Sequence, residues 1–138
     1  MSGVLSEVRW IAFPNSRDER GVLTAIEGGS NIPFEVRRIF YMYGTPPQIE
    51  RGGHAHTDSR QVVIAICGRF KLDLSDGTNT RTFELVDPDR GVFMPRMTWA
   101  RLYEFSPGAV CLVLADTHYD RAKSIRTWAE FLAAVRKQ

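Results

Sequence analysis

Residues 69–86 read Arg-Phe-Lys-Leu-Asp-Leu-Ser-Asp-Gly-Thr-Asn-Thr-Arg-Thr-Phe-Glu-Leu-Val, and this stretch decides the class of fold. Apolar and polar side chains alternate in its first part, so Phe70, Leu72 and Leu74 share one face of a strand. The Ser-Asp-Gly-Thr-Asn segment that follows predicts a hairpin turn, after which the alternation resumes. The stretch therefore predicts two antiparallel strands joined by a short turn.

Similar short segments recur along the chain about every 8–12 residues, a spacing typical of β-sandwiches and β-barrels. The sequence therefore predicts an all-β protein. Besides Arg69–Leu74, the expected strands are Val22–Ile26, Phe34–Tyr43, Gln61–Cys67, Thr80–Val86, Gly91–Met94, Thr98–Phe105 and Ala109–Ala115.

The C-terminal stretch alone departs from the period of two. A Thr-Trp-Ala-Glu segment at residues 127–130 can form a capping box at the start of a helix. We expect one short helix over residues 124–137 that covers part of the β core, within a single domain spanning residues 1–138. The apolar side chains that follow helical spacings of three and four are Ile125, Trp128, Phe131, Leu132 and Val135.

Composition excludes several classes of function. The 138 residues carry 18 Lys+Arg and 16 Asp+Glu, a net charge of +2 without a run of like charge, which argues against nucleic-acid binding. No apolar stretch reaches the roughly 20 residues that cross a bilayer, and Met1–Trp10 lacks the apolar core of a signal peptide. Cys67 and Cys111 lie in apolar runs, so we expect buried, reduced thiols in a cytoplasmic protein. A disulfide or a reactive thiol is the alternative.

The segment Arg51-Gly52-Gly53-His54-Ala55-His56 is the first candidate for chemistry. On a strand, His54 and His56 point to the same side. Two imidazoles on one face suit metal binding or proton transfer near neutral pH. The two glycines let the backbone bend or bulge just before them. Two histidines without a function are the alternative interpretation of a bare His-x-His pattern.

The spacing after these histidines resembles the ligand frame of the cupin barrel, in which His-x-His is followed by an acid and, in a second block, by another histidine. Here Gln61 stands at the position of the acid and Ala100 at that of the last histidine. A divalent ion would keep at most two imidazoles and a neutral amide, with no carboxylate to offset its charge. We therefore expect a cupin barrel without a metal, with no sub-micromolar site for Zn²⁺, Ni²⁺ or Mn²⁺ at His54.

Several further motifs follow one another in order between Arg20 and Phe131. They are Arg20-Gly21 with Ile26-Glu27, Ile32-Pro33-Phe34, Arg38-Ile39-Phe40-Tyr41, the block at residues 51–56, Gln61, Trp99, Tyr119-Asp120, Ile125-Arg126 and Glu130-Phe131. Together they resemble the nucleotide-sugar 3,4-ketoisomerases, a cupin branch that acts on dTDP-4-keto-6-deoxyglucose. The resemblance implies an enzyme without metal or organic cofactor that moves the keto group from C4 to C3 through an enediol. An aminotransferase could then install an amine at C3, in the biosynthesis of a deoxyamino sugar such as one of the O-antigen.

The resemblance also implies roles for individual residues. His54 is expected to act as the base at C3, and His56 as the acid that delivers a proton to C4. Arg38 and Arg51 are expected to bind the diphosphate, because a guanidinium matches phosphate oxygens with two donors. The other residues expected in the substrate pocket are Arg20, Tyr43, Gln61, Trp99 and Arg101.

The chain departs from the family pattern at two places. Members often carry a histidine where this chain has Ala100, and usually an acid and an aromatic residue around Lys123-Ser124. Both departures leave room for an altered substrate or product. The gluco or galacto configuration of the product, the final sugar and the order of the two histidine roles stay open.

Two other functions are compatible with the sequence. One is a 3,5-epimerase of the same nucleotide sugar, and the other is a cupin that binds a sugar nucleotide without converting it. Gln61 and Ala100 make a metal-dependent cupin enzyme the weakest alternative. The family resemblance further implies a homodimer with exchanged N-terminal strands, for which the apolar segment Val8–Phe13 is suited.

Overall fold

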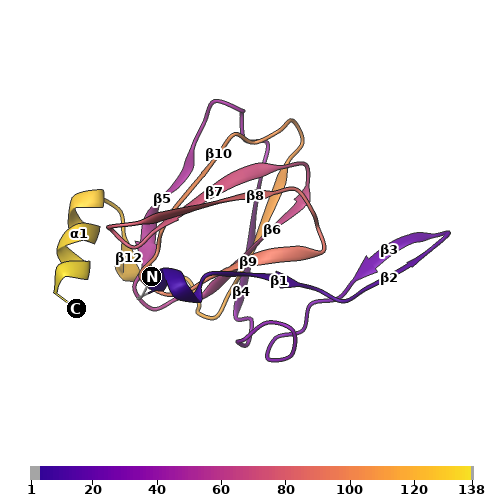
Figure 1. Ribbon diagram of the computed structural model, residues 1–138, viewed down its shortest axis with the longest axis horizontal. Helices are drawn as coiled ribbons and strands as arrows, with labels where there is room; N and C mark the ends of the chain where they lie inside the picture. The colour runs from indigo at the N-terminus through magenta and orange to yellow at the C-terminus, as the bar shows by residue number, and fades with distance from the viewer. Residues whose placement is uncertain (1–3, 138) are drawn as a thin grey trace.

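The computed structural model describes residues 4–137 and shows two antiparallel β-sheets that pack face to face as a barrel (Figure 1). Residues 1–3 and 138, which belong to the expected domain, lie outside the described residues. One sheet has the order β1-β9-β6-β11-β4, with β1 (Arg9–Ala12), β4 (Arg38–Tyr43), β6 (Gln61–Cys67), β9 (Arg90–Met94) and β11 (Val110–Ala115). The other has the order β12-β5-β10-β7-β8, with β5 (Arg51–His56), β7 (Phe70–Ser75), β8 (Thr80–Leu85), β10 (Trp99–Tyr103) and β12 (Ser124–Ile125).

The alternating sequence patterns predicted most of these strands but not β1, β5 and β12, and the all-β class is confirmed. Strand β6 has the predicted bounds, Gln61–Cys67. Strand β7 buries the apolar side of its alternation between the sheets, where Phe70 and Leu72 are in the core. The predicted turn joins β7 to β8, and the Asp76 carboxylate accepts hydrogen bonds from two backbone N–H groups within it.

The expected strand at residues 34–43 begins only at Arg38. Phe34 instead packs against Phe93, with ring centroids 6.4 Å apart, on the outer face of the first sheet. Val62 of β6 is buried beneath this cover. The loop therefore shields the outer face, so that both faces of the central strand β6 are apolar.

The two cysteines differ in environment. Cys111 is buried as expected, and burial raises the pKa of its thiol to about 12, which makes it a poor nucleophile. The expectation of a buried Cys67 is wrong, because this residue ends β6 and is exposed beside the turn at Gly68. Both thiols are free.

One helix, α1 (Trp128–Arg136), packs against the outer side of the second sheet (Figure 1). It begins at Trp128 rather than at residue 124, because Ser124–Ile125 pair with β5 as strand β12. The predicted cap is present, since the Thr127 hydroxyl accepts a hydrogen bond from the Glu130 backbone N–H. Phe131 is fully buried between the helix and β5. No described helix has the length and apolarity that a membrane span requires.

A two-stranded hairpin, β2 (Asn15–Asp18) and β3 (Gly21–Thr24), projects away from the barrel (Figure 1). Strand β1 precedes it and pairs with β9 of the same chain. Most of Val8–Phe13, the segment expected to be exchanged, is therefore built into the chain's own sheet. Two short 3-10 helices complete the described elements, η1 (Val4–Glu7) and η2 (Arg121–Lys123).

Candidate active site

The backbone of β5 is bent just before the two histidines. Gly52 and Gly53 have φ angles of +86° and +74°, a region that favours glycine, and the pairing of β5 with β10 shifts register beside Ala100. A Cβ atom on Gly52 would lie 2.7 Å from the Ala100 carbonyl oxygen, so the close strand approach requires glycine there. The bulge predicted from the glycine pair is therefore present and lies directly before His54 and His56 in β5.

The two imidazoles lie on one wall of a cavity inside the barrel. Their ring centroids are 4.9 Å apart and their planes meet at 84°. Ala55 between them points the opposite way and is buried beneath α1, as the alternation of a strand requires. The cavity has a volume of about 130 Å³. Besides the histidines it is lined by Phe40, Met42, Arg51, Gly52, Gln61, Val63, Leu72, Met94, Ala100, Leu102 and Val113.

A second hollow, of about 410 Å³, adjoins this cavity and shares both histidines with it. We call it the outer hollow; Arg38, Tyr119, Ser124 and Arg126 also line it. The Arg38 guanidinium carbon lies 5.4 Å from the centroid of the Tyr119 ring, and Arg126 donates to the Tyr119 hydroxyl at 3.4 Å. Within the described residues neither arginine forms an ion pair, so both positive charges are available to an anion.

The surroundings favour the neutral form of both imidazoles. Burial lowers the pKa of His56 to about 4, helped by the charges of His54, Arg38 and Arg126. Burial also lowers the pKa of His54; a hydrogen bond to the Gly52 carbonyl opposes this shift and the charge of Arg126 adds to it. At neutral pH each ring therefore keeps one unprotonated nitrogen, which a general base needs.

The C-terminal segment adds two residues that were not predicted for the site. Ser124 pairs with His56 in the register of β12 and β5, and its Oγ lies 3.4 Å from Nδ1 of the ring. Arg126 reaches the outer hollow from just beyond the same strand. The signal for Arg126 was present in the sequence, because this residue lies in the Ile125-Arg126 motif that supported the family resemblance. Ser124 lies where the chain departs from the family pattern, so no motif pointed to it.

Gln61 and Ala100, the two positions where the cupin frame lacks its ligands, both line the cavity with His54 and His56. The Gln61 side chain is buried, and its Nε2 is one of the described buried polar atoms without a hydrogen-bond partner. Within residues 4–137 no group of three or more histidine, cysteine, aspartate or glutamate side chains is placed so that it could hold a metal ion. Two imidazoles and an amide do not fit a tightly bound divalent metal.

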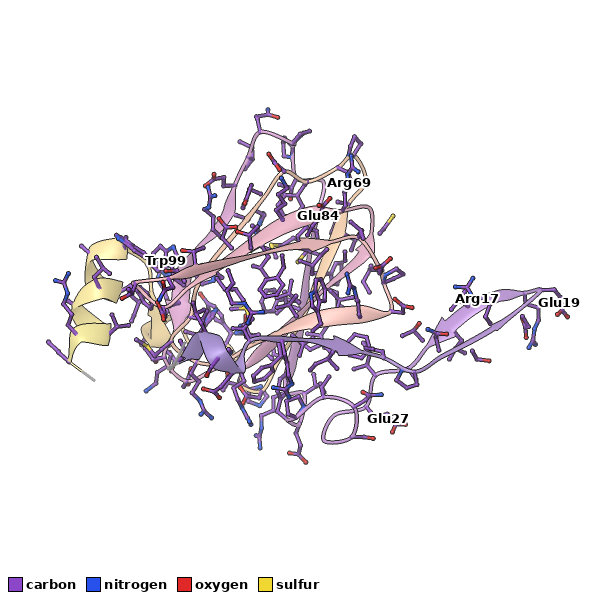
Figure 2. All side chains as sticks on the ribbon, viewed as in Figure 1. Arg17, Glu19, Glu27, Arg69, Glu84 and Trp99 are labelled. Carbon is purple, nitrogen blue, oxygen red and sulfur yellow. The ribbon has the colours of Figure 1, made fainter. Side chains whose placement is uncertain are left out.

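The alternation of β10 directs two predicted pocket residues away from the cavity. Ala100 faces inward, so Trp99 and Arg101 lie on the outer face of the sheet. Trp99 packs beside α1, with its ring 5.6 Å from that of Phe131 (Figure 2). Arg101 donates to the Asp73 carboxylate at 3.0 Å. Packing and ion pairing therefore account for both side chains.

Two other predicted residues also lie outside this chain's cavity. On β4 the side chains of Arg38, Phe40 and Met42 point inward. Tyr43 therefore faces outward, is 70% exposed and stacks on Tyr41. Arg20 lies at the tip of the projecting hairpin, paired with Asp18 at 2.6 Å. Of the predicted substrate-pocket residues, the structure brings Arg38, Arg51 and Gln61 to the histidines.

The chain matches the FdtA family, described as WxcM-like, C-terminal, over residues 6–136. It belongs to this family. Within curated proteins it is 34% identical over 131 residues to the TDP-4-oxo-6-deoxy-alpha-D-glucose-3,4-oxoisomerase of Aneurinibacillus thermoaerophilus, covering 95% of this chain and 94% of the relative.

Solved structures of 3,4-ketoisomerases share the architecture. A 3,4-ketoisomerase from Helicobacter canadensis superimposes with a TM-score of 0.92 at 38% identity, covering 94% of this chain and 98% of that one. A histidine-to-asparagine mutant of the 3,4-ketoisomerase QdtA from Thermoanaerobacterium thermosaccharolyticum, in complex with TDP-4-keto-6-deoxyglucose, gives 0.92 at 33% identity and covers 95% of each chain. The cupin barrel predicted from the sequence is confirmed.

Proposed function

We propose that this protein is a nucleotide-sugar 3,4-ketoisomerase that converts TDP-4-keto-6-deoxyglucose to its 3-keto isomer. The observation that carries the proposal is the pair of neutral imidazoles, 4.9 Å apart on one wall of a cavity, in a chain of the FdtA family. The substrate is supported by the oxoisomerase relative and by the QdtA mutant crystallised with this sugar nucleotide.

In the proposed mechanism His54 removes the proton from C3, which is acidic because it lies next to the C4 carbonyl. The electron pair of that C–H bond forms the C3–C4 double bond, and the π pair of the C4 carbonyl moves to O4, which gives the enediolate. His56 then delivers a proton to C4, while the hydroxyl proton passes from O3 to O4 and the carbonyl forms at C3. A positioned acid–base pair contributes roughly 10²–10⁴-fold, so other groups must stabilise the intermediate.

Gln61 is suited to that task. Its buried Nε2 donor has no partner among the described residues and lines the cavity that holds the histidines. A donor fixed in an apolar cavity stabilises negative charge on an enediolate oxygen more strongly than water does, since it needs no reorganisation. We propose that Gln61 donates to the oxygen on C3 or C4, and that no metal ion shares this role.

Three arginines supply the positive charge that a diphosphate needs. Arg38 and Arg126 line the outer hollow and Arg51 the inner cavity. Within the described residues none of them forms an ion pair. Guanidinium groups offer paired donors to phosphate oxygens. We propose that the diphosphate binds at the outer hollow, with the sugar directed toward the histidines.

We further propose a homodimer in which the projecting hairpin β2–β3, rather than Val8–Phe13, is exchanged between protomers. The hairpin exposes apolar surface, since Leu23 is 67% exposed. The edge strand β4 likewise exposes Tyr43 on its outer face. In such a dimer Arg20 would meet the partner's site instead of its own. Sedimentation velocity should give a dimer for the wild type and a smaller dimer fraction for Leu23→Asp.

The test of the activity is incubation with TDP-4-keto-6-deoxyglucose, followed by proton NMR. Movement of the keto group to C3, trapped as an amine by a 3-aminotransferase, is the expected result. Inversion at C5 would instead identify an epimerase, and binding without exchange of the C3 hydrogen in D₂O would identify a binding protein. The His54→Asn variant should bind the sugar nucleotide and lose turnover, whereas near-normal turnover would remove His54 from the mechanism.

The product places the protein before an amination step, because a 3-keto sugar is what an aminotransferase needs to install nitrogen at C3. We propose that it serves the synthesis of a 3-amino-3,6-dideoxy sugar for a surface glycan such as an O-antigen. A cytoplasmic location is supported by the two free thiols, since disulfides are rare in that compartment.

A further inference from the structure

The proposed acid, His56, faces a difficulty that a free imidazole in water does not. Its ring is neutral near pH 7, because it is partly buried among positive charges. A neutral imidazole that gives up its only N–H proton would become an imidazolate, a very strong base. Delivery of the proton from one nitrogen therefore requires a proton to arrive at the other nitrogen.

The structure places one hydroxyl at that second nitrogen. Ser124 Oγ lies 3.4 Å from Nδ1 of His56. The contact is fixed by the backbone, because Ser124 and His56 are register partners in β12 and β5. Thr57 ties the same segments together, since its backbone N–H and its hydroxyl both donate to the Lys123 carbonyl, at 2.9 and 3.2 Å.

The direction of this hydrogen bond follows from the neighbours. Within residues 4–137 the Ser124 side chain has no other hydrogen-bond partner, so Nδ1 is the acceptor available to its proton. The groups whose charge acts on His56 are His54, Arg38 and Arg126, and none is a carboxylate that would hold a proton on Nδ1. His54 differs from His56, because one of its ring nitrogens donates a hydrogen bond to the Gly52 carbonyl. The other nitrogen of His54 is therefore left unprotonated and can act as a base.

We propose that Ser124 is a positioning residue that donates its hydroxyl hydrogen bond to Nδ1 of His56, so that Nε2 carries the proton for the sugar and Ser124 resupplies the ring. This inference rests on the proposed isomerase activity. In the resupply step the Nε2–H bond breaks as the C4–H bond forms. At the same time the Oγ–H bond of Ser124 breaks and an Nδ1–H bond forms. The proton that His54 took from C3 then passes through water to Nε2 of His56 while the Nδ1 proton returns to Oγ, so both rings and the serine end in their starting states.

Proton removal at C3 and proton delivery at C4 are separate half-reactions, and measurements in D₂O can follow each of them. Removal of the C3 hydrogen depends on His54, and proton delivery to C4 depends on His56 and its resupply. We expect Ser124→Ala to retain the rate of C3 hydrogen exchange within about twofold. Its rate of product formation should fall about three- to tenfold, the effect of losing one hydrogen bond. KM should stay unchanged, and Ser124→Thr, which keeps the hydroxyl on a strand position, should restore the rate.

The matched control is Thr57→Val, which removes a hydroxyl that joins the same two segments without touching the ring. It should leave product formation unchanged. If Thr57→Val lowers the rate as much as Ser124→Ala, the effect comes from a loosened strand and the inference fails. It also fails if Ser124→Ala slows C3 exchange and product formation equally, or slows neither.

Nitrogen NMR of ¹⁵N-histidine-labelled wild type gives a second readout that does not depend on turnover. The His56 signals, assigned by comparison with His56→Asn, should show an unprotonated Nδ1 and a protonated Nε2, and Ser124→Ala should shift the tautomer balance. A proton resident on Nδ1 in the wild type would overturn the inference. Absence of keto transfer by the wild type would instead refute the proposed function, so the two failures are distinguishable.

Discussion

The low pKa of His56 predicts a specific dependence of stability on pH. In the unfolded chain the imidazole has an ordinary pKa near 6.5, whereas in the folded protein the pKa is about 4. Below pH 6.5 the unfolded chain binds a proton that the folded protein does not, so the free energy of unfolding falls as the pH is lowered toward 4. Between pH 7 and pH 5 the two pKa values give a loss of about 2 kcal/mol. Solvent screening of a half-buried ring reduces it to about 1 kcal/mol.

The measurement is urea denaturation of the wild type and of His56→Asn at pH 7 and pH 5. The variant should lose about 1 kcal/mol less stability between these pH values than the wild type does. His118→Asn removes an exposed histidine outside the cavity and is the matched control, which should retain the wild-type difference. Equal losses in wild type and His56→Asn would refute a depressed pKa at His56, and with it the neutral imidazole on which the proposed mechanism relies.

Four further variants, one of them a control, test the backbone, the helix and the missing ligands. Gly52→Ala, with its Cβ 2.7 Å from the Ala100 carbonyl oxygen, should lower the free energy of unfolding by at least about 2 kcal/mol in urea titrations. Gly53→Ala has open space and should cost less; equal costs would refute the close approach. Phe131→Ala should cost about 3–5 kcal/mol in the same assay, and a loss below about 1 kcal/mol would contradict its burial. Calorimetry should detect no sub-micromolar Zn²⁺ site in the wild type. It should detect a stoichiometric site in Gln61→Glu/Ala100→His, since a carboxylate and a third imidazole then join the cavity. A tight Zn²⁺ site in the wild type would refute the loss of ligands.

Local pattern was sufficient for most strands because their signals are local, although it missed β1, β5 and β12. The alternation in Phe70 and Leu72 sets which residues share a face, and the turn at Asp76 depends on side chains within the turn itself. The capping Thr127 is likewise a local signal. The predicted strand was wrong for residues 34–37, because their apolar side chains pack onto the sheet from a loop.

The period of a strand does not say which of its two faces is the interior, and the family resemblance that predicted the pocket residues did not say it either. On β10 the resemblance implied that Trp99 lies in the pocket, whereas Ala100 is the residue that faces this chain's cavity. The outer face could take an aromatic ring because α1 covers it. For Arg101 the deciding contact is with Asp73 of the neighbouring strand β7, which sequence spacing alone does not reveal.

The contribution of the C-terminal segment depends on contacts between distant parts of the chain. Ser124 meets His56 across 68 residues, and only the register of β12 on β5 brings its hydroxyl to the ring. That register is held from outside the barrel, where Phe131 packs against Ala55 on the opposite side of β5. Since Ala55 separates the two histidines, the same apolar contact that anchors α1 also fixes the strand that carries both imidazoles. Stability of the helix and geometry of the site are therefore coupled. A loss of packing at Phe131 should shift the backbone of β5 that positions His56.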